Sequence, residues 1–368
     1  MPRSIATHAL LWMFVLAVTP SVARCQEYDH GQMAGDVNPV TPQLGIHGFF
    51  DITLAATRTR HGSADSTSFG SGLGQLDLLL TSRISERISF LGEVVLEAED
   101  NGDSAADVER AYVRYSLSDH LRVSAGRTHA AVSYWYVTCH HGGLLQPTIT
   151  RPAPVRFEDE PGGGYLPAHA VGLELGGHES LGDVTFSWVA NLANGRPARR
   201  QQVQTSRDRN QDKQLGMSAT LSGSGALEWH AGGALFHDRA ANDEGIGPET
   251  DQDIANMHLA LRHAWFDQVG EYFVVRDLDR TTRIERSNRA WYGVVSLGPG
   301  PWRPYVATEG MRMASGDAYY AGLPNMDRVT AGLRYDINAF NVVKLEYRNG
   351  TTDGARTHEL LLQTAFTF

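Results

Sequence analysis

Apolar and polar residues alternate along most of the chain after position 43, with a period of two rather than the 3.6 of a helix. The alternation is clearest over 184–192, 215–221 and 343–347. A period of two is typical of β-strands that have one apolar face. The pattern predicts sixteen strands, and counts of fourteen to eighteen stay open because boundaries read from a sequence shift by about two to four residues. The predicted strands are 43–57, 73–82, 88–98, 107–117, 120–128, 167–177, 182–192, 213–222, 226–237, 252–263, 268–278, 287–297, 302–312, 326–337, 340–348 and 356–368.

The connections between these strands alternate between short and long. Short ones include 118–119, 223–225 and 338–339. The long ones are 58–72, 99–106, 129–166, 193–212, 238–251, 279–286, 313–325 and 349–355. Most of the predicted strands have the length that a tilted strand needs to cross a bilayer, about 9–11 residues. Short turns at one end and long loops at the other are typical of a barrel in an outer membrane.

The two faces of the predicted strands differ in the way that a water-filled barrel requires. In the strand 107–117, Val113 and Tyr115 lie on one face, and Arg110 and Arg114 lie on the other. Strands that span lipid must close into a barrel, because every backbone amide there needs a partner. Closure at about sixteen strands leaves an aqueous channel. The sequence therefore predicts an all-β protein, a single closed antiparallel transmembrane β-barrel over residues 43–368.

The last predicted strand ends on an aromatic residue. Leu360, Leu362, Phe366 and Phe368 share one face, and Phe368 is the final residue. Phe366 and Phe368 resemble the C-terminal signal that the barrel assembly machinery reads in bacterial outer-membrane β-barrel proteins. Together with the strands and connections, this ending makes residues 43–368 similar to the porin class. The resemblance implies an outer-membrane channel for passive diffusion of small hydrophilic solutes or ions, contact with lipid and lipopolysaccharide, and a possible homotrimer.

The first residues have the three parts of a secretory signal peptide. Arg3 and His8 precede the apolar run 10–18, and small residues at Ser21 and Ala23 follow it. We therefore expect a cleaved signal peptide at 1–23 and a flexible periplasmic segment at 24–42. No apolar run long enough for a membrane helix occurs later in the chain.

Composition and charge narrow the class further. The chain has 368 residues, two cysteines and a formal net charge of −10. Two cysteines exclude a disulfide-rich scaffold, and the acidic balance argues against nucleic-acid binding. The mean hydropathy of −0.30 is that of a soluble protein on average. A barrel explains it equally well, because only every second residue of a strand faces lipid and polar loops dilute the total.

The third long connection, 129–166, is where specificity is expected. By resemblance to general porins, it folds into the barrel. Its acidic residues then oppose arginines on the wall across a constriction. The arginines are Arg110, Arg114 and Arg122, and the acids are Glu158, Asp159 and Glu160. Opposed charges at a constriction screen solutes by size and dipole. The alternative is that the three acids lie in solvent and stabilise only the loop.

The same loop holds a possible metal site at Cys139, His140 and His141, with His129 and His169 at its flanks. Thiolate and imidazole ligands suit copper or zinc. The spacing matches no standard zinc pattern, so hydrogen-bonded histidines in a packed loop are the alternative. We expect no cofactor and no enzymatic activity. An outer-membrane lipase or protease barrel is the competing function, although no Gly-x-Ser-x-Gly motif occurs. A metal-associated outer-membrane protein and a secreted soluble β-protein also remain open.

Overall fold

The computed structural model describes residues 43–98, 104–138, 142–158, 160, 162–198, 200, 208, 211–241 and 249–368. Sixteen strands and two short helical segments, α1 (Tyr134–Thr138) and the 3-10 turn η1 (Ala153–Val155), make up its regular structure. The strands are β1 (Gln43–His61), β2 (Ala64–Arg83), β3 (Ile88–Ala98), β4 (Ser104–Ser116), β5 (Leu121–His129), β6 (His169–Leu181), β7 (Val184–Asn194), β8 (Lys213–Gly223), β9 (Leu227–Ala240), β10 (Thr250–His263), β11 (Phe266–Asp279), β12 (Glu285–Leu297), β13 (Trp302–Arg312), β14 (Met326–Asn338), β15 (Asn341–Thr352) and β16 (Ala355–Thr367). Within the described ranges, no helix is long and apolar enough to cross a membrane.

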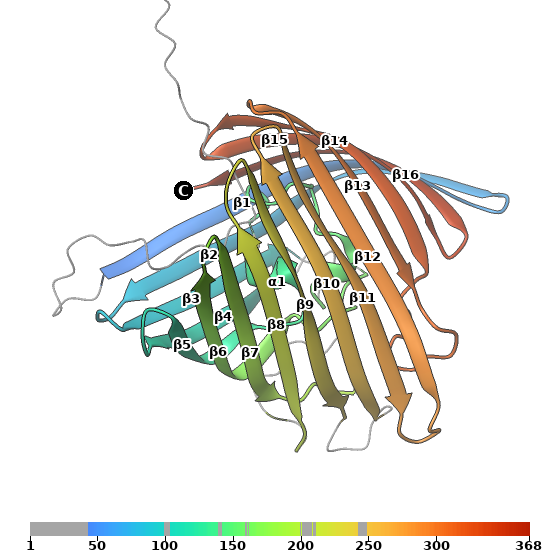
Figure 1. Ribbon diagram of the computed structural model, residues 1–368. Helices are drawn as coiled ribbons and strands as arrows, with labels where there is room; N and C mark the ends of the chain where they lie inside the picture. The colour runs from blue at the N-terminus through green and yellow to red at the C-terminus, as the bar shows by residue number, and fades with distance from the viewer. Residues whose placement is uncertain are drawn as a thin grey trace, which may run out of the picture.

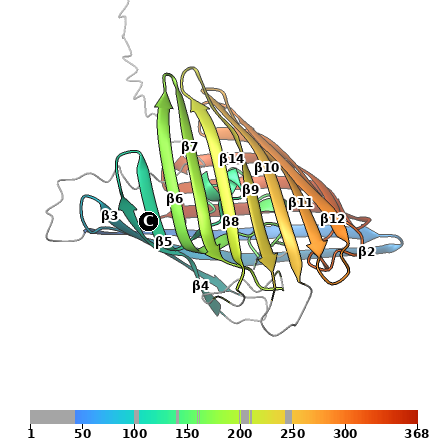
Figure 2. The same ribbon diagram turned by 60° about the horizontal axis from the view of Figure 1, so that its bottom comes forward.

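The strands form one closed antiparallel barrel (Figures 1 and 2). Each strand pairs with its sequence neighbours, and β1 pairs with β16 to close the ring. The final residue takes part in this closure, because Gly48 N–H donates to the Phe368 carbonyl at 2.9 Å and Phe368 N–H donates back at 3.0 Å. Closure leaves no strand with an unpaired edge, which is the condition for β-structure in lipid. The predicted fold class and strand count are confirmed.

The two faces of the barrel differ as the alternation predicts. The outer face carries exposed apolar side chains such as Val113, Leu175 and Leu259. The inner face carries buried charged side chains, and Glu93, Lys344 and Glu346 are among the least exposed residues of the chain. A soluble protein places these two classes of residue the other way round. The inversion fits a wall that has lipid outside and a polar interior.

The prediction of a long loop at 58–72 is wrong, because most of these residues belong to the strands β1 and β2. The two strands meet at a turn of only Gly62 and Ser63. Ion pairs from Arg58 and Arg60 to Asp65, at 2.6 and 3.3 Å, lie along this hairpin. Its residues are polar on both faces and exposed, so no apolar period marks them as strands. The connection predicted at 349–355 shrinks in the same way, to a turn between β15 and β16.

Candidate functional site

The connection between β5 and β6 lies inside the barrel. α1 sits within the ring of strands in both views (Figures 1 and 2). Trp135 and Tyr165 from this connection are almost fully buried, in one apolar cluster with Phe273 of β11 and Tyr292 of β12. The rings of Trp135 and Tyr292 meet edge to face, with centroids 5.6 Å apart. The loop therefore packs against the inner wall and fills part of the lumen.

A single wall carboxylate holds the start of α1. Glu271 of β11 accepts hydrogen bonds from the Ser133 hydroxyl at 2.8 Å and from the backbone N–H groups of Tyr134 and Trp135 at 2.8 and 2.9 Å. It also accepts from the Asn256 amide at 2.8 Å and the Tyr292 hydroxyl at 2.6 Å. Five donors compensate the buried charge, which would otherwise be costly. Glu271 is thus the main polar anchor between this loop and the wall at β11.

A later stretch of the loop, residues 143–148, is held by the wall at β14 and β15. Arg334 donates to the backbone carbonyls of Leu144 and Gln146 at 2.8 and 3.0 Å. Lys344 donates to the Gly143 and Thr148 carbonyls at 2.5 and 2.9 Å. Hydrogen bonds in which one partner is charged are about twice as strong as neutral ones. The loop is therefore tied to two separate parts of the barrel wall and crosses the lumen between them.

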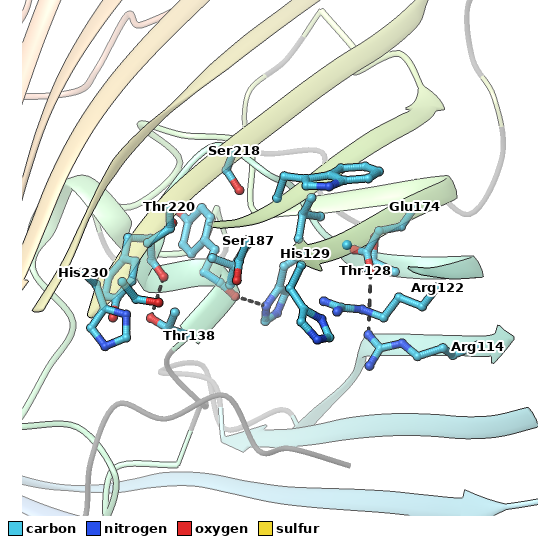
Figure 3. A pocket seen from close by; sticks show the side chains of 18 of the residues that line it. Arg114, Arg122, Thr128, His129, Thr138, Glu174, Ser187, Ser218, Thr220 and His230 are labelled. Atoms are coloured by element: carbon cyan, nitrogen blue, oxygen red, sulfur yellow. Dashed lines mark hydrogen bonds and ion pairs between the residues drawn. The ribbon is translucent and has the colours of Figure 1, made fainter. Parts of the chain in front are cut away.

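A polar cavity of about 410 Å³ remains beside this loop. The wall from β4 to β10 lines one side of it, and Tyr134, Tyr136 and Thr138 of α1 line the other. Figure 3 shows Arg114 and Arg122 at one side of the cavity, with Thr138 and His230 at the other. The cavity therefore lies inside the barrel, between the inward loop and the wall.

Four arginines and two glutamates line the cavity, namely Arg110, Arg114, Arg122, Arg262, Glu174 and Glu228. Three of the arginines have an acidic neighbour on the wall. Arg110 pairs with Glu93 at 2.5 Å, and Arg262 pairs with Glu228 at 2.8 Å. Arg114 lies 3.7 Å from Glu174. With four arginines against two glutamates, the cavity lining carries more positive than negative groups.

Comparisons with known proteins place this architecture among solved structures. No protein-family model and no curated protein sequence matches the chain. An anion-selective porin from Comamonas acidovorans matches with a TM-score of 0.62 at 12% identity, covering 89% of this chain and all of that one. The outer membrane channel DcaP of Acinetobacter baumannii matches with a TM-score of 0.57 at 12% identity, covering 91% of this chain and 100% of that one. OmpT, an outer membrane protein of Vibrio cholerae in a trimer form, matches with a TM-score of 0.53 at 12% identity, over 89% and 100% of the two chains.

The chain has the fold of the bacterial outer-membrane porins. The evidence is the closed sixteen-strand barrel together with these neighbours, and at such identities the likeness concerns the fold alone.

The three arginines predicted for the constriction all line the cavity of this porin fold. Two of the predicted acids, Glu158 and Glu160, have their closest partners elsewhere. Glu160 pairs with Arg151 within the loop, and Glu158 accepts from the Ala168 N–H at 2.9 Å. Burial works against the charged carboxylate of Glu158, but contacts with His169 and the Ala168 N–H hold its pKa below the ordinary value. Asp159, like Cys139, His140 and His141, lies outside the described residues.

The structure also brings together residues that the sequence did not single out. Glu271 stands at an inward position of β11, and Glu174 and Glu228 stand at inward positions of β6 and β9. The sequence could have singled out Glu271, because it is an acidic residue at an inward-facing position of a largely apolar strand segment. Which loop atoms it meets depends on long-range packing. The predicted assembly residues lie at the seam, where the Phe366 ring contacts Phe50 with centroids 5.2 Å apart.

Proposed function

We propose that the protein is an outer-membrane porin that forms a water-filled channel for passive diffusion of small hydrophilic solutes or ions. One observation carries the proposal: a closed barrel with an apolar outer face keeps a polar cavity of about 410 Å³ beside an inward-folded loop. A barrel of about sixteen strands is wide enough for an aqueous channel, and a loop across it sets the width. Among known structures, the porin and channel neighbours support the same function.

The proposed constriction has Arg110, Arg114 and Arg122 on one side, where the β4 and β5 wall faces α1. The facing lining contributes Tyr134, Thr138 and His230. Opposition of Glu158, Asp159 and Glu160 to these arginines stays a prediction. Glu160 pairs with Arg151 and Glu158 accepts from the Ala168 N–H, and Asp159 lies outside the described residues. The acidic charges of the cavity lining are those of Glu174 and Glu228.

The setting of the channel belongs to the same proposal. Residues 1–23 are a signal peptide that is removed on export, and 24–42 are a flexible periplasmic segment. The barrel, residues 43–368, is inserted in a bacterial outer membrane by the assembly machinery, which reads Phe366 and Phe368, and it contacts lipid and lipopolysaccharide. It acts without a cofactor and without enzymatic activity. A homotrimer is proposed on the example of OmpT, which has been solved in a trimer form.

Liposome swelling with sugars of increasing size tests the channel. The refolded full-length barrel is reconstituted, and its folding is confirmed by heat-modifiable migration in detergent gels. We expect fast swelling with small neutral sugars and a steep loss of rate as the solute approaches the size of the cavity. Folded protein that gives no swelling with any sugar, together with hydrolysis of a lipid or peptide, would support the competing enzyme function instead.

A further inference from the structure

Two histidines and a glutamate lie close together where the inward loop leaves β5 and where it enters β6. Glu109 comes from β4, His129 ends β5 and His169 begins β6. One ligand atom from each of the three residues can be chosen so that all three lie within 4.8 Å of one another. All three side chains are buried or nearly so. Neighbouring strands of one sheet hold the three residues, so the barrel itself sets their spacing.

The hydrogen bond of His129 fixes which ring nitrogen can bind a ligand. Its Nδ1 lies 2.8 Å from the Tyr136 carbonyl oxygen. A carbonyl oxygen only accepts, so Nδ1 carries the proton. In the neutral ring, Nε2 is then the nitrogen with the lone pair. Metal-binding histidines typically donate their other ring N–H to a backbone carbonyl or a carboxylate in this way.

His169 and Glu158 leave buried polar atoms without a hydrogen bond. His169 Nε2 lies 2.6 Å from a carboxylate oxygen of Glu109. Its other nitrogen, Nδ1, is 3.7 Å from Glu158 Oε2, and neither of these atoms has a hydrogen-bond partner. Nδ1 and Nε2 point away from each other, so when Nε2 binds a cation beside Glu109, Nδ1–H faces Glu158 as an outer carboxylate partner. Glu158 thereby adds a second carboxylate beside the two imidazoles.

We propose that Glu109, His129 and His169 bind a divalent cation of the zinc class, with Glu158 as a neighbouring carboxylate. Imidazole nitrogens with a carboxylate suit Zn²⁺, Cu²⁺ or Ni²⁺, whereas Mg²⁺ and Ca²⁺ prefer all-oxygen sites. The nearby cations do not prevent this, because Arg110 pairs with Glu93 at 2.5 Å and Arg151 pairs with Glu160. His129 also lines the polar cavity, which gives the ion a path from the lumen.

The proposed ion ties three strands to the loop that narrows the lumen. Its ligands stand on β4, β5 and β6, and Glu158 belongs to the loop itself. The site requires neither channel activity nor Cys139, His140 and His141, which the sequence singled out. It uses only the flanking histidines of that prediction.

Metal binding to the refolded, chelator-treated full-length barrel tests the site. Calorimetry with Zn²⁺, and with Mg²⁺ for comparison, measures stoichiometry and affinity. We expect one Zn²⁺ per chain, no saturable Mg²⁺ binding, and at least about tenfold weaker Zn²⁺ binding in His129→Ala and His169→Ala. Two controls should keep the wild-type affinity within about twofold: His258→Gln elsewhere in the lumen, and the triple variant Cys139→Ser/His140→Ala/His141→Ala.

X-ray absorption of the zinc-loaded wild type keeps the test decisive if a variant fails to fold. The site predicts nitrogen and oxygen ligands with two imidazoles and no sulfur. The proposal is overturned by a zinc–sulfur distance, by loss of binding in the triple variant alone, or by the absence of saturable Zn²⁺ binding. In that last case His169 is a simple hydrogen-bonded link between Glu109 and Glu158.

Discussion

At the scale of single residues, we expect the charges of the cavity to decide which ions pass the proposed channel. The lining holds four arginines against two glutamates, and their closest contacts run along the wall. We expect a modest preference for anions over cations. A unit charge about 5 Å from a permeating ion in water is worth about 0.8 kcal/mol, roughly a fourfold effect at low salt, and salt weakens it.

Reversal potentials in a salt gradient measure this preference. Arg114→Ala should lower the anion-to-cation permeability ratio by up to about sixteenfold at low salt, because the lost charge favoured anions and disfavoured cations by about fourfold each. Glu160→Gln is the matched control, since Glu160 pairs with Arg151 and is not part of the lining, and it should leave the ratio unchanged. An equal and opposite change in Glu160→Gln would instead favour the acid–arginine opposition predicted from the sequence.

Glu271 is the residue whose loss should free the loop. Each hydrogen bond to a charged group contributes about 1.5–3 kcal/mol, and three of its five bonds hold residues 133–135. Glu271→Gln replaces one acceptor oxygen by a donor that faces other donors. We expect trypsin to cleave the variant after Arg156, which Phe157 follows, while the barrel stays heat-modifiable. Glu228→Gln should remain protected, because the partners of Glu228, Arg262 and His230, belong to the wall, and protection of both variants would contradict the role given to Glu271.

At the scale of elements, a glycine in the inward loop decides whether the loop keeps its path. A Cβ at Gly163 would lie 1.7 Å from the Phe157 carbonyl oxygen, a backbone atom that cannot move aside without moving the loop. Gly163→Ala should therefore displace the loop and raise the size limit for sugars in liposome swelling. Gly300→Ala is the control, because a Cβ there meets open space. An unchanged size limit in Gly163→Ala would show that the loop does not set the width.

The seam between β1 and β16 gives a second prediction for an element. Deleting Phe368 removes the two backbone hydrogen bonds with Gly48 at the end of the seam. We expect a lower refolding yield and a lower unfolding temperature in detergent. Phe368→Leu keeps those bonds, so it should refold normally in vitro and lose assembly only in cells. If both variants lost refolding yield equally in vitro, the Phe368 ring would act by packing against the β1–β16 seam rather than as an assembly signal.

The strands also show which parts of the fold could be predicted from the sequence. Wherever one face of a strand meets lipid, the alternation predicted the strand, and all sixteen were found. The alternation gave no strand at 58–72, because Arg58, Arg60 and Asp65 belong to a β-hairpin in which polar residues occur on both faces. Parity placed Arg110 and Arg114 on the inward face, whereas Arg122 was added through the resemblance to general porins. The partners of Glu271 depend on the folded path of a long loop. The meeting of Glu109 with His129 and His169 depends on the register of β4, β5 and β6, and no local pattern encodes either of these.

At the scale of the whole molecule, the barrel and the loop have different structural roles. The barrel satisfies the backbone in lipid and presents apolar residues outward. The loop, anchored at β11, β14 and β15, reduces a wide lumen to a charged polar cavity. The acidic net charge of −10 does not describe the lining, which is basic on balance. Overall charge is therefore a poor guide to the solute that this barrel admits.

Single-channel recording in planar lipid bilayers tests the central claim most directly, with wild type beside Glu271→Gln. If the loop narrows an open channel, the wild type gives stable, discrete conductance steps. Release of the loop then makes the steps larger or noisier, while reversal potentials keep their sign. Folded wild-type barrel that inserts into the bilayer and carries no current at any voltage would contradict the account.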